Sequence, residues 1–117
     1  MKVEEYSFGW IKIEGKEYTH DLWIINGEIY KRDKGLSKRL FQTSHRIPME
    51  ELEKILRENT KRVIIGTGED GLVSVEENGA KYLEEKGIKL EMYKTGELAK
   101  MKLQFGKDDS GIIHLTC

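Results

Sequence analysis

Three glycines that follow a short apolar run form the pattern with the clearest chemical implication in this chain. Residues 62–71 read Arg-Val-Ile-Ile-Gly-Thr-Gly-Glu-Asp-Gly, with glycines at 66, 68 and 71. Glycines at this spacing let backbone N–H groups approach a phosphate when a strand leads into a helix. The turn Gly66-Thr67-Gly68 is therefore a candidate site for a small anion or polar ligand.

The residues after the glycines disfavour a dinucleotide site. Such a site needs its last glycine inside the first turn of the following helix. Here Leu72-Val73 continue as extended chain, and Ser74-x-x-Glu77 is a capping box that predicts where the helix begins. A chain of 117 residues also lacks a second mononucleotide-binding half. A tight strand-to-helix turn without any ligand is therefore favoured over the anion site, which is kept as the alternative.

The spacing of the histidines and the cysteine predicts neither a metal site nor a nucleophile pair. His20, His45 and His114 include no i, i+4 pair, and the sequence offers no tetrahedral set of zinc ligands. His114 and Cys117 are three apart on a predicted strand, which places them on opposite faces. Cys117 would then share a face with Ile113 and Leu115, as a buried and inert thiol. We expect no catalytic residue, metal or cofactor.

Two charged residues of the N-terminal half are further candidates for a ligand site. Asp21 directly precedes the apolar segment 22–25, so it either points into a polar site or caps a turn or strand end. Arg32 belongs to a basic stretch. This stretch contains one acid, Asp33, among Lys31, Arg32, Lys34, Lys38, Arg39 and Arg46. With Tyr30 and Phe41 it could hold nucleic acid, but a solvated loop or a loop that docks an acidic protein is favoured.

The first third of the sequence predicts an antiparallel meander. Residues 8–13 alternate in polarity and meet a turn at Glu14-Gly15-Lys16. The extended segment 18–25 leads to Asn26-Gly27, the strongest short hairpin signal, and residues 28–32 return as the paired strand. Residues 33–46 show no periodicity and predict a long polar connection.

The remainder predicts alternating helices and strands. Pro48 is expected at the first position of a helix that runs toward Asn59, with Glu50, Glu51 and Glu53 near its positive end. A strand at 62–65, a helix at 75–86 and a strand at 88–93 form one βαβ unit with parallel strands. Thr95 is expected to cap a short helix at 97–103, before a final strand at 112–117. The predicted fold is thus a single three-layer α/β domain over residues 1–117, with a mixed central sheet.

Composition narrows the function classes. The formal net charge of −1 gives no support for binding nucleic acid or an anionic membrane. Charged residues make up 35% of the chain, mostly Lys and Glu, with Gln only at 42 and 104 and Asn only at 26, 59 and 78, which is typical of thermophilic proteins. The single cysteine fits a reducing cytoplasm, and neither a signal peptide nor a membrane span is expected.

Several short strings together resemble the Mth-type uncharacterised domain family. They are Phe8-Gly9-x-Ile11-x-Ile13-x-Gly15, Tyr18-x-x-Asp21, Lys31-Arg32, Ile64-Ile65-Gly66-Thr67-Gly68, Tyr82-Leu83, Gly87-Ile88, Thr95 and His114-Leu115-Thr116-Cys117. This family includes an adipogenesis-associated protein and an assembly factor of mitochondrial complex I. The resemblance implies a three-layer α/β domain without an established reaction or cofactor, and eukaryotic members that act through protein partners. The chain departs from the family at Leu98 and Leu103, where Ala and Asn are usual.

The sequence thus favours a cytoplasmic, non-catalytic binding or assembly module with a protein partner, as a monomer or small homo-oligomer. The alternative is a protein, possibly an enzyme, that binds a small anion or polar ligand where strand ends converge. Gly66, Thr67 and Gly68 lie just past one strand end and Thr95 past its expected neighbour, while Asp21 and Arg32 could reach the same edge.

Overall fold

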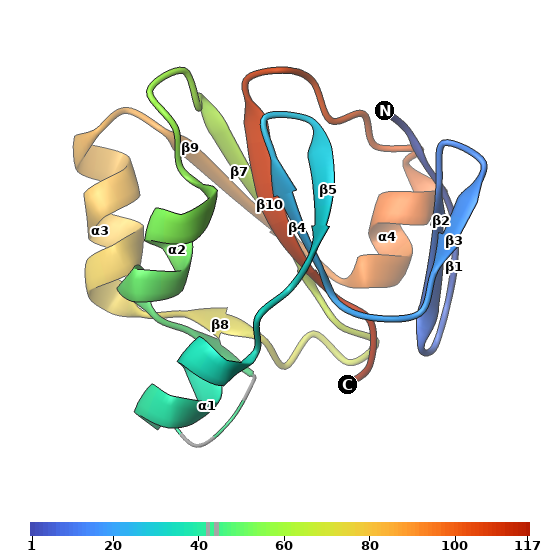
Figure 1. The fold of residues 1–117 in the computed structure, drawn as a ribbon, viewed down its shortest axis with the longest axis horizontal. Helices are drawn as coiled ribbons and strands as arrows, with labels where there is room; N and C mark the ends of the chain where they lie inside the picture. Colours follow the sequence, from blue (N-terminus) through green and yellow to red (C-terminus); the bar gives the residue numbers. More distant parts are fainter. Residues whose placement is uncertain (42, 44) are drawn as a thin grey trace.

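The centre of the molecule is a five-stranded mixed sheet with the order β5-β4-β10-β7-β9 (Figure 1). Its strands are β4 (Leu22–Ile25), β5 (Glu28–Lys31), β7 (Arg62–Thr67), β9 (Lys89–Tyr93) and β10 (Asp109–His114). β7, β9 and β10 are parallel, whereas β4 pairs antiparallel with both β10 and β5. The computed structural model describes residues 1–41, 43 and 45–117. The predicted mixed sheet is confirmed.

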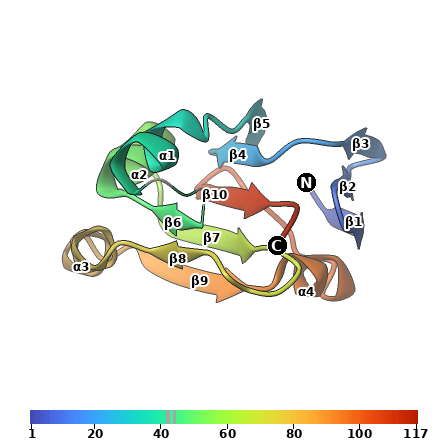
Figure 2. The same ribbon diagram turned by 90° about the horizontal axis from the view of Figure 1, so that it is seen from below.

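The remaining elements form the outer layers and the connections (Figure 2). A second antiparallel sheet contains β1 (Val3–Ser7), β2 (Trp10–Ile13) and β3 (Lys16–Tyr18). The helices are α1 (Gly35–Phe41), α2 (Met49–Ile55), α3 (Glu77–Glu85) and α4 (Thr95–Lys100). A two-stranded parallel ladder joins β6 (Arg46–Ile47) to β8 (Ser74–Val75).

Both faces of the central sheet are buried because its middle strands are apolar on both sides. Ile64 and Ile113 pack with residues of β1, β2 and α4 in one core cluster. Val63, Ile65 and Ile112 point the other way and pack with residues of α2 and α3 in a second cluster. The alternation along β7 and β10 therefore produces the three predicted layers.

Several local predictions are confirmed. Asn26 and Gly27 have positive φ values of 50° and 82°, as a type I′ hairpin requires. Gly87 follows α3 with a φ of 71°, which is the left-handed conformation expected after a helix. β7, α3 and β9 form the βαβ unit, with β7 and β9 parallel.

The meander differs from the prediction, because it is divided between two sheets. β3 ends at Tyr18 and stays with β1 and β2, whereas β4 begins at Leu22 and pairs with β10. Leu22 and Ile24 of β4 are fully buried, in the core cluster that also contains Ile64 and Ile113. The structure also has a strand that was not predicted, β1, and the strand predicted at 8–13 begins only at Trp10, as β2.

The prediction of an irregular connection over 33–46 is wrong for most of that segment. Residues 35–41 form α1, and Arg46 and Ile47 form β6. The Asp33 carboxylate accepts the Gly35 N–H at 2.9 Å, which forms a turn just before α1. Gln42 and Ser44 lie outside the described residues.

The predicted ends of several other elements were also wrong. Ser74 belongs to β8, where its N–H donates to the carbonyl of His45, and α3 begins at Glu77 without a side-chain cap. α2 begins at Met49, with Pro48 as its N-cap residue, and ends at Ile55. β10 ends at His114 instead of continuing to residue 117. Among the described residues, none of the helices has the length and apolar character that crossing a bilayer requires.

Candidate functional site

The parallel strands β7, β9 and β10 end at one edge of the central sheet, and most of the predicted site residues gather there. Thr67 lies opposite His114 on β10, and Gly66 lies opposite Tyr93 on β9. In open α/β sheets this carboxyl edge is where ligands bind. The prediction that Thr95 and the glycine turn converge is confirmed by their direct hydrogen bond.

Thr95 links the ends of all three parallel strands. Its Oγ1 accepts the Gly68 N–H at 2.9 Å and donates to the carbonyl of His114 at 2.6 Å. The side chain is fully buried. The prediction that Thr95 caps the next helix is wrong, because Lys94 is the N-cap residue of α4 and Glu97 accepts the Lys94 N–H. The hydroxyl is instead used to join strand ends.

The glycine turn is filled by the C-terminal segment of the chain. Gly68 has a φ of 95°, and a Cβ there would lie 2.6 Å from the carbonyl oxygen of Thr116. The next N–H, on Glu69, donates to that same oxygen at 2.7 Å. Thr67 Oγ1 donates to the carbonyl of Tyr93 at 3.0 Å. The hydrogen-bond donors of this turn therefore donate to groups of the protein itself. Gly68 has no Cβ, which lets the backbone carbonyl of Thr116 approach closely.

Asp21 lies in a buried cluster of hydrogen-bond donors beside the same edge. Oδ1 accepts the Leu115 N–H at 2.9 Å, and Oδ2 lies 2.6 Å from His114 Nδ1, 3.0 Å from Arg32 Nη1 and 3.4 Å from Lys34 Nζ. Burial would raise the pKa of Asp21, but the hydrogen bonds from His114 and Leu115 and the charge of Lys34 lower this pKa to about 2. Asp21 is therefore an ionised acceptor rather than an exposed strand cap.

Arg32 connects Asp21 to a second buried carboxylate, Glu51 on α2. Arg32 Nε and Nη2 donate to the two Glu51 oxygens at 2.7 and 3.1 Å, and Trp23 Nε1 donates to Glu51 at 2.8 Å. Glu51 is fully buried, although the sequence analysis assigned it to the charged start of a helix. The signal was present, because Glu51 lies four residues before the buried Ile55 and so shares its helical face.

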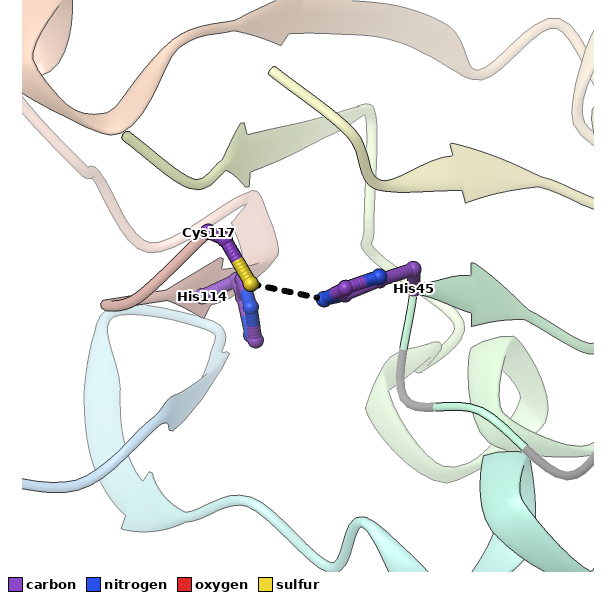
Figure 3. A group of neighbouring side chains, drawn as sticks. All are labelled: His45, His114 and Cys117. Atoms are coloured by element: carbon purple, nitrogen blue, oxygen red, sulfur yellow. Dashed lines mark hydrogen bonds between the residues drawn. The ribbon is translucent and has the colours of Figure 1, made fainter. Parts of the chain in front are cut away.

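Two further side chains, His45 and Cys117, meet His114 at this edge, and the sequence did not predict this contact. Cys117 Sγ lies 3.2 Å from His45 Nε2, and the rings of His45 and His114 stand edge to face with centroids 5.3 Å apart (Figure 3). The predicted opposite placement of His114 and Cys117 is wrong, because the strand ends at His114 and the chain then turns. Cys117 is half-buried beside His45 instead of buried with Ile113 and Leu115.

Four of the six predicted ligand-binding residues belong to one hydrogen-bonded network, and Gly66 and Thr67 lie beside it. The path runs from Arg32 through Asp21 and His114 to Thr95 and Gly68. Thr67 is next to Gly68, and a Cβ at Gly66 would lie 3.0 Å from Thr95 Oγ1.

Two open hollows lie beside this network. One, of about 400 Å³, is lined by residues next to Asp21, including Lys31, Arg32, Lys34, His20 and Thr116. The other, of about 490 Å³, lies between the β1–β2 turn and α4 and is lined by Tyr6, Phe8, Glu69, Lys94, Glu97 and Lys100, among others. We call the second hollow the Phe8 groove.

Fold and site together define a small α/β protein whose mixed sheet carries a buried polar network at its carboxyl edge. The chain belongs to the family described as a protein of unknown function (DUF498/DUF598), whose model matches residues 3–101. This match confirms the expected membership of an uncharacterised domain family. No curated protein matches the chain.

Solved structures support the same assignment. The conserved hypothetical protein PH1505 from Pyrococcus horikoshii OT3 is 39% identical over the full length of both chains, with a TM-score of 0.88. A protein named MT938 is 28% identical over the full length of both chains, with a TM-score of 0.79. A protein from Bordetella parapertussis, 15% identical over 97% of this chain and 93% of its own, shares the fold with a TM-score of 0.66.

Proposed function

We propose that this chain is a non-catalytic binding or assembly module that acts in the cytoplasm through a protein partner. The resemblance to domains of adipogenesis-associated and complex I assembly proteins supports this proposal by analogy. The alternative, a ligand at Gly66-Thr67-Gly68, has less support, because the N–H groups of Gly68 and Glu69 already donate to Thr95 and Thr116. Among the described residues, every buried side-chain nitrogen and oxygen also has a hydrogen-bond partner.

The observation that carries the proposal is the exposure of Phe8 in the Phe8 groove. Phe8 is 58% exposed, and the half-buried Tyr6 stands in the same groove. The groove is also lined by exposed side chains of both charges, which include Glu69, Lys94 and Lys100. An aromatic centre with a mixed polar rim is the composition of a protein–protein contact. We infer a partner segment that places an apolar side chain against Phe8 and Tyr6.

The groove is held in place before any partner binds. The Tyr6 hydroxyl and the Gly9 N–H both donate to the carbonyl of Leu115, at 2.9 and 3.0 Å. These two bonds fix the β1–β2 turn to the segment that follows β10. Pre-ordering of this kind lowers the conformational cost of binding and so favours affinity.

Site-specific photo-crosslinking in the native cells tests the proposal. A photoreactive amino acid replaces Phe8 in one variant, and in the matched control it replaces Met92, which is 41% exposed on β9 and is not among the groove-lining residues. We expect a cross-linked protein partner from position 8 and not from position 92. Equal products from both positions, or a product that contains only a second copy of this chain, would contradict the proposal.

A further inference from the structure

We propose that His45, His114 and Cys117 form a binding site for a thiophilic metal ion, with Zn²⁺ or Cu⁺ as the chemical class. One ligand atom from each residue lies within 4.8 Å of the other two. In Figure 3 the side chains converge from two separate segments, since His45 precedes β6 and the other two residues end β10 or follow it. This site is independent of the Phe8 groove.

The distances suit a small ion. Zinc binds nitrogen and sulfur at about 2.0–2.3 Å, so tetrahedral donors lie about 3.3–3.6 Å apart. Cys117 Sγ and His45 Nε2 are already 3.2 Å apart. The widest pair, within 4.8 Å, closes to that range through side-chain rotation of Cys117 and His45, both of which are half-buried.

Asp21 orients His114 as a metal ligand. The Asp21 carboxylate also accepts the Leu115 N–H at 2.9 Å and Arg32 Nη1 at 3.0 Å, so in the 2.6 Å contact it acts as the acceptor and His114 Nδ1 as the donor. In the neutral ring this leaves a lone pair on Nε2, where the Thr116 hydroxyl lies 3.3 Å away. A metal-bound histidine almost always donates its other ring N–H to a carboxylate, a backbone carbonyl or water, and Asp21 fills that place here.

The ligand set determines which ions bind. One thiolate and two imidazoles favour zinc and copper over magnesium and calcium, which prefer oxygen donors. Cys117 loses its thiol proton to solvent as the ion binds, so the ion replaces the hydrogen shared with His45 and no oxidation state changes. No fourth residue of ligating type joins the group among the described residues, so solvent or a partner's side chain would complete the tetrahedron.

Cobalt substitution tests the site on the purified, reduced, metal-stripped chain. We expect one equivalent of Co²⁺ to give a near-ultraviolet thiolate-to-cobalt absorption, and one equivalent of Zn²⁺ to remove it. Cys117→Ser should abolish this band. His45→Ala should weaken Co²⁺ binding at least about 10-fold, and Asp21→Asn about 10–100-fold, as is usual when the residue behind a ligand is lost.

His20→Ala is the matched control, because His20 is exposed and lies outside the group. Its affinity should equal that of the wild type, and circular dichroism should show that all variants are folded. Failure of the wild type to give the thiolate band at one equivalent would overturn the proposal. So would wild-type affinity in Cys117→Ser or His45→Ala, because thiol and imidazole would then share only a hydrogen bond.

Discussion

Asp21 and His114 are joined at 2.6 Å across 93 positions of the chain, so one buried hydrogen bond ties the start of β4 to the end of β10. Arg32 donates to the same Asp21 oxygen and also donates to Glu51 on α2. The network therefore connects the central sheet to one helical layer. Removing Asp21 takes a buried acceptor away from His114, Arg32 and the Leu115 N–H, which is costly.

Asp21→Asn should lower stability in a pH-dependent way. The Asp21 pKa falls from 3.8 to about 2 on folding, so its contribution is present above pH 3.8 and is lost as the pH falls through about 2. This shift corresponds to roughly 2 kcal/mol, and the lost Arg32–Asp21 contact adds to the loss. Urea unfolding at pH 7 and pH 2 measures this loss. The difference in free energy of unfolding between wild type and Asp21→Asn should be smaller at pH 2 than at pH 7.

The exposed Asp70→Asn is the matched control for that experiment and should behave as wild type at both pH values. A gap for Asp21→Asn that stays constant between pH 7 and pH 2 would contradict an ionised Asp21 in the folded protein.

Gly68→Ala should destabilise the fold more than Gly15→Ala. Both glycines have positive φ, 95° and 77°, so each alanine carries a backbone cost of about 1 kcal/mol. A Cβ at Gly15 meets nothing within 4 Å, whereas at Gly68 it would lie 2.6 Å from the Thr116 carbonyl. Thermal melts of the two variants give the comparison, and equal losses would show that the turn does not need this close approach.

Phosphate, sulfate and nucleotides at millimolar concentration should leave the melting temperature unchanged. The N–H groups of Gly68 and Glu69 already donate to Thr95 and Thr116, so this turn offers no pair of N–H groups to an anion. A ligand at 100 times its Kd would add roughly 2.7 kcal/mol to stability, which a melt detects easily. A clear rise that Thr67→Ala abolishes would support the ligand site at this turn instead.

The purified protein should melt in the hyperstable range, above roughly 90 °C. The Lys- and Glu-rich surface supplies ion-pair networks such as that of Arg62, which lies 2.9 Å from Asp109 and 3.6 Å from Glu91. Differential scanning calorimetry measures this directly. A transition near 55 °C would refute the inference from composition.

The sequence predicted the elements whose signals are local. The Asn26-Gly27 turn, the stop at Gly87 and the βαβ unit around α3 follow from turn chemistry and periodicity. Helix α1 was missed because it begins with a glycine and residues 33–46 show no helical periodicity. Ser74 satisfies the capping-box pattern, yet pairing of β8 with β6 prevails over that local preference.

The candidate site was predicted in part, for a similar reason. Strand ends in a parallel sheet meet at one edge, which placed Thr95 beside the glycine turn from sequence alone. The spacing of Glu51 to Ile55 indicates its buried face, but its contact with Arg32 depends on the packing of distant segments, as does the contact of His45 with Cys117. The role of Thr95 was misjudged because its hydroxyl binds the carbonyl of His114 instead of the start of α4.

The affinity of this chain for the protein cross-linked at position 8 tests the proposed function most directly. Isothermal titration with that purified partner should show binding by the wild type and unchanged binding by Met92→Ala. Phe8→Ala should bind at least 10-fold more weakly, which is a loss of about 1.4 kcal/mol in binding free energy. Phe8 is 58% exposed, so its removal should spare the fold. Equal affinity of wild type and Phe8→Ala would contradict the claim that the protein acts through the Phe8 groove.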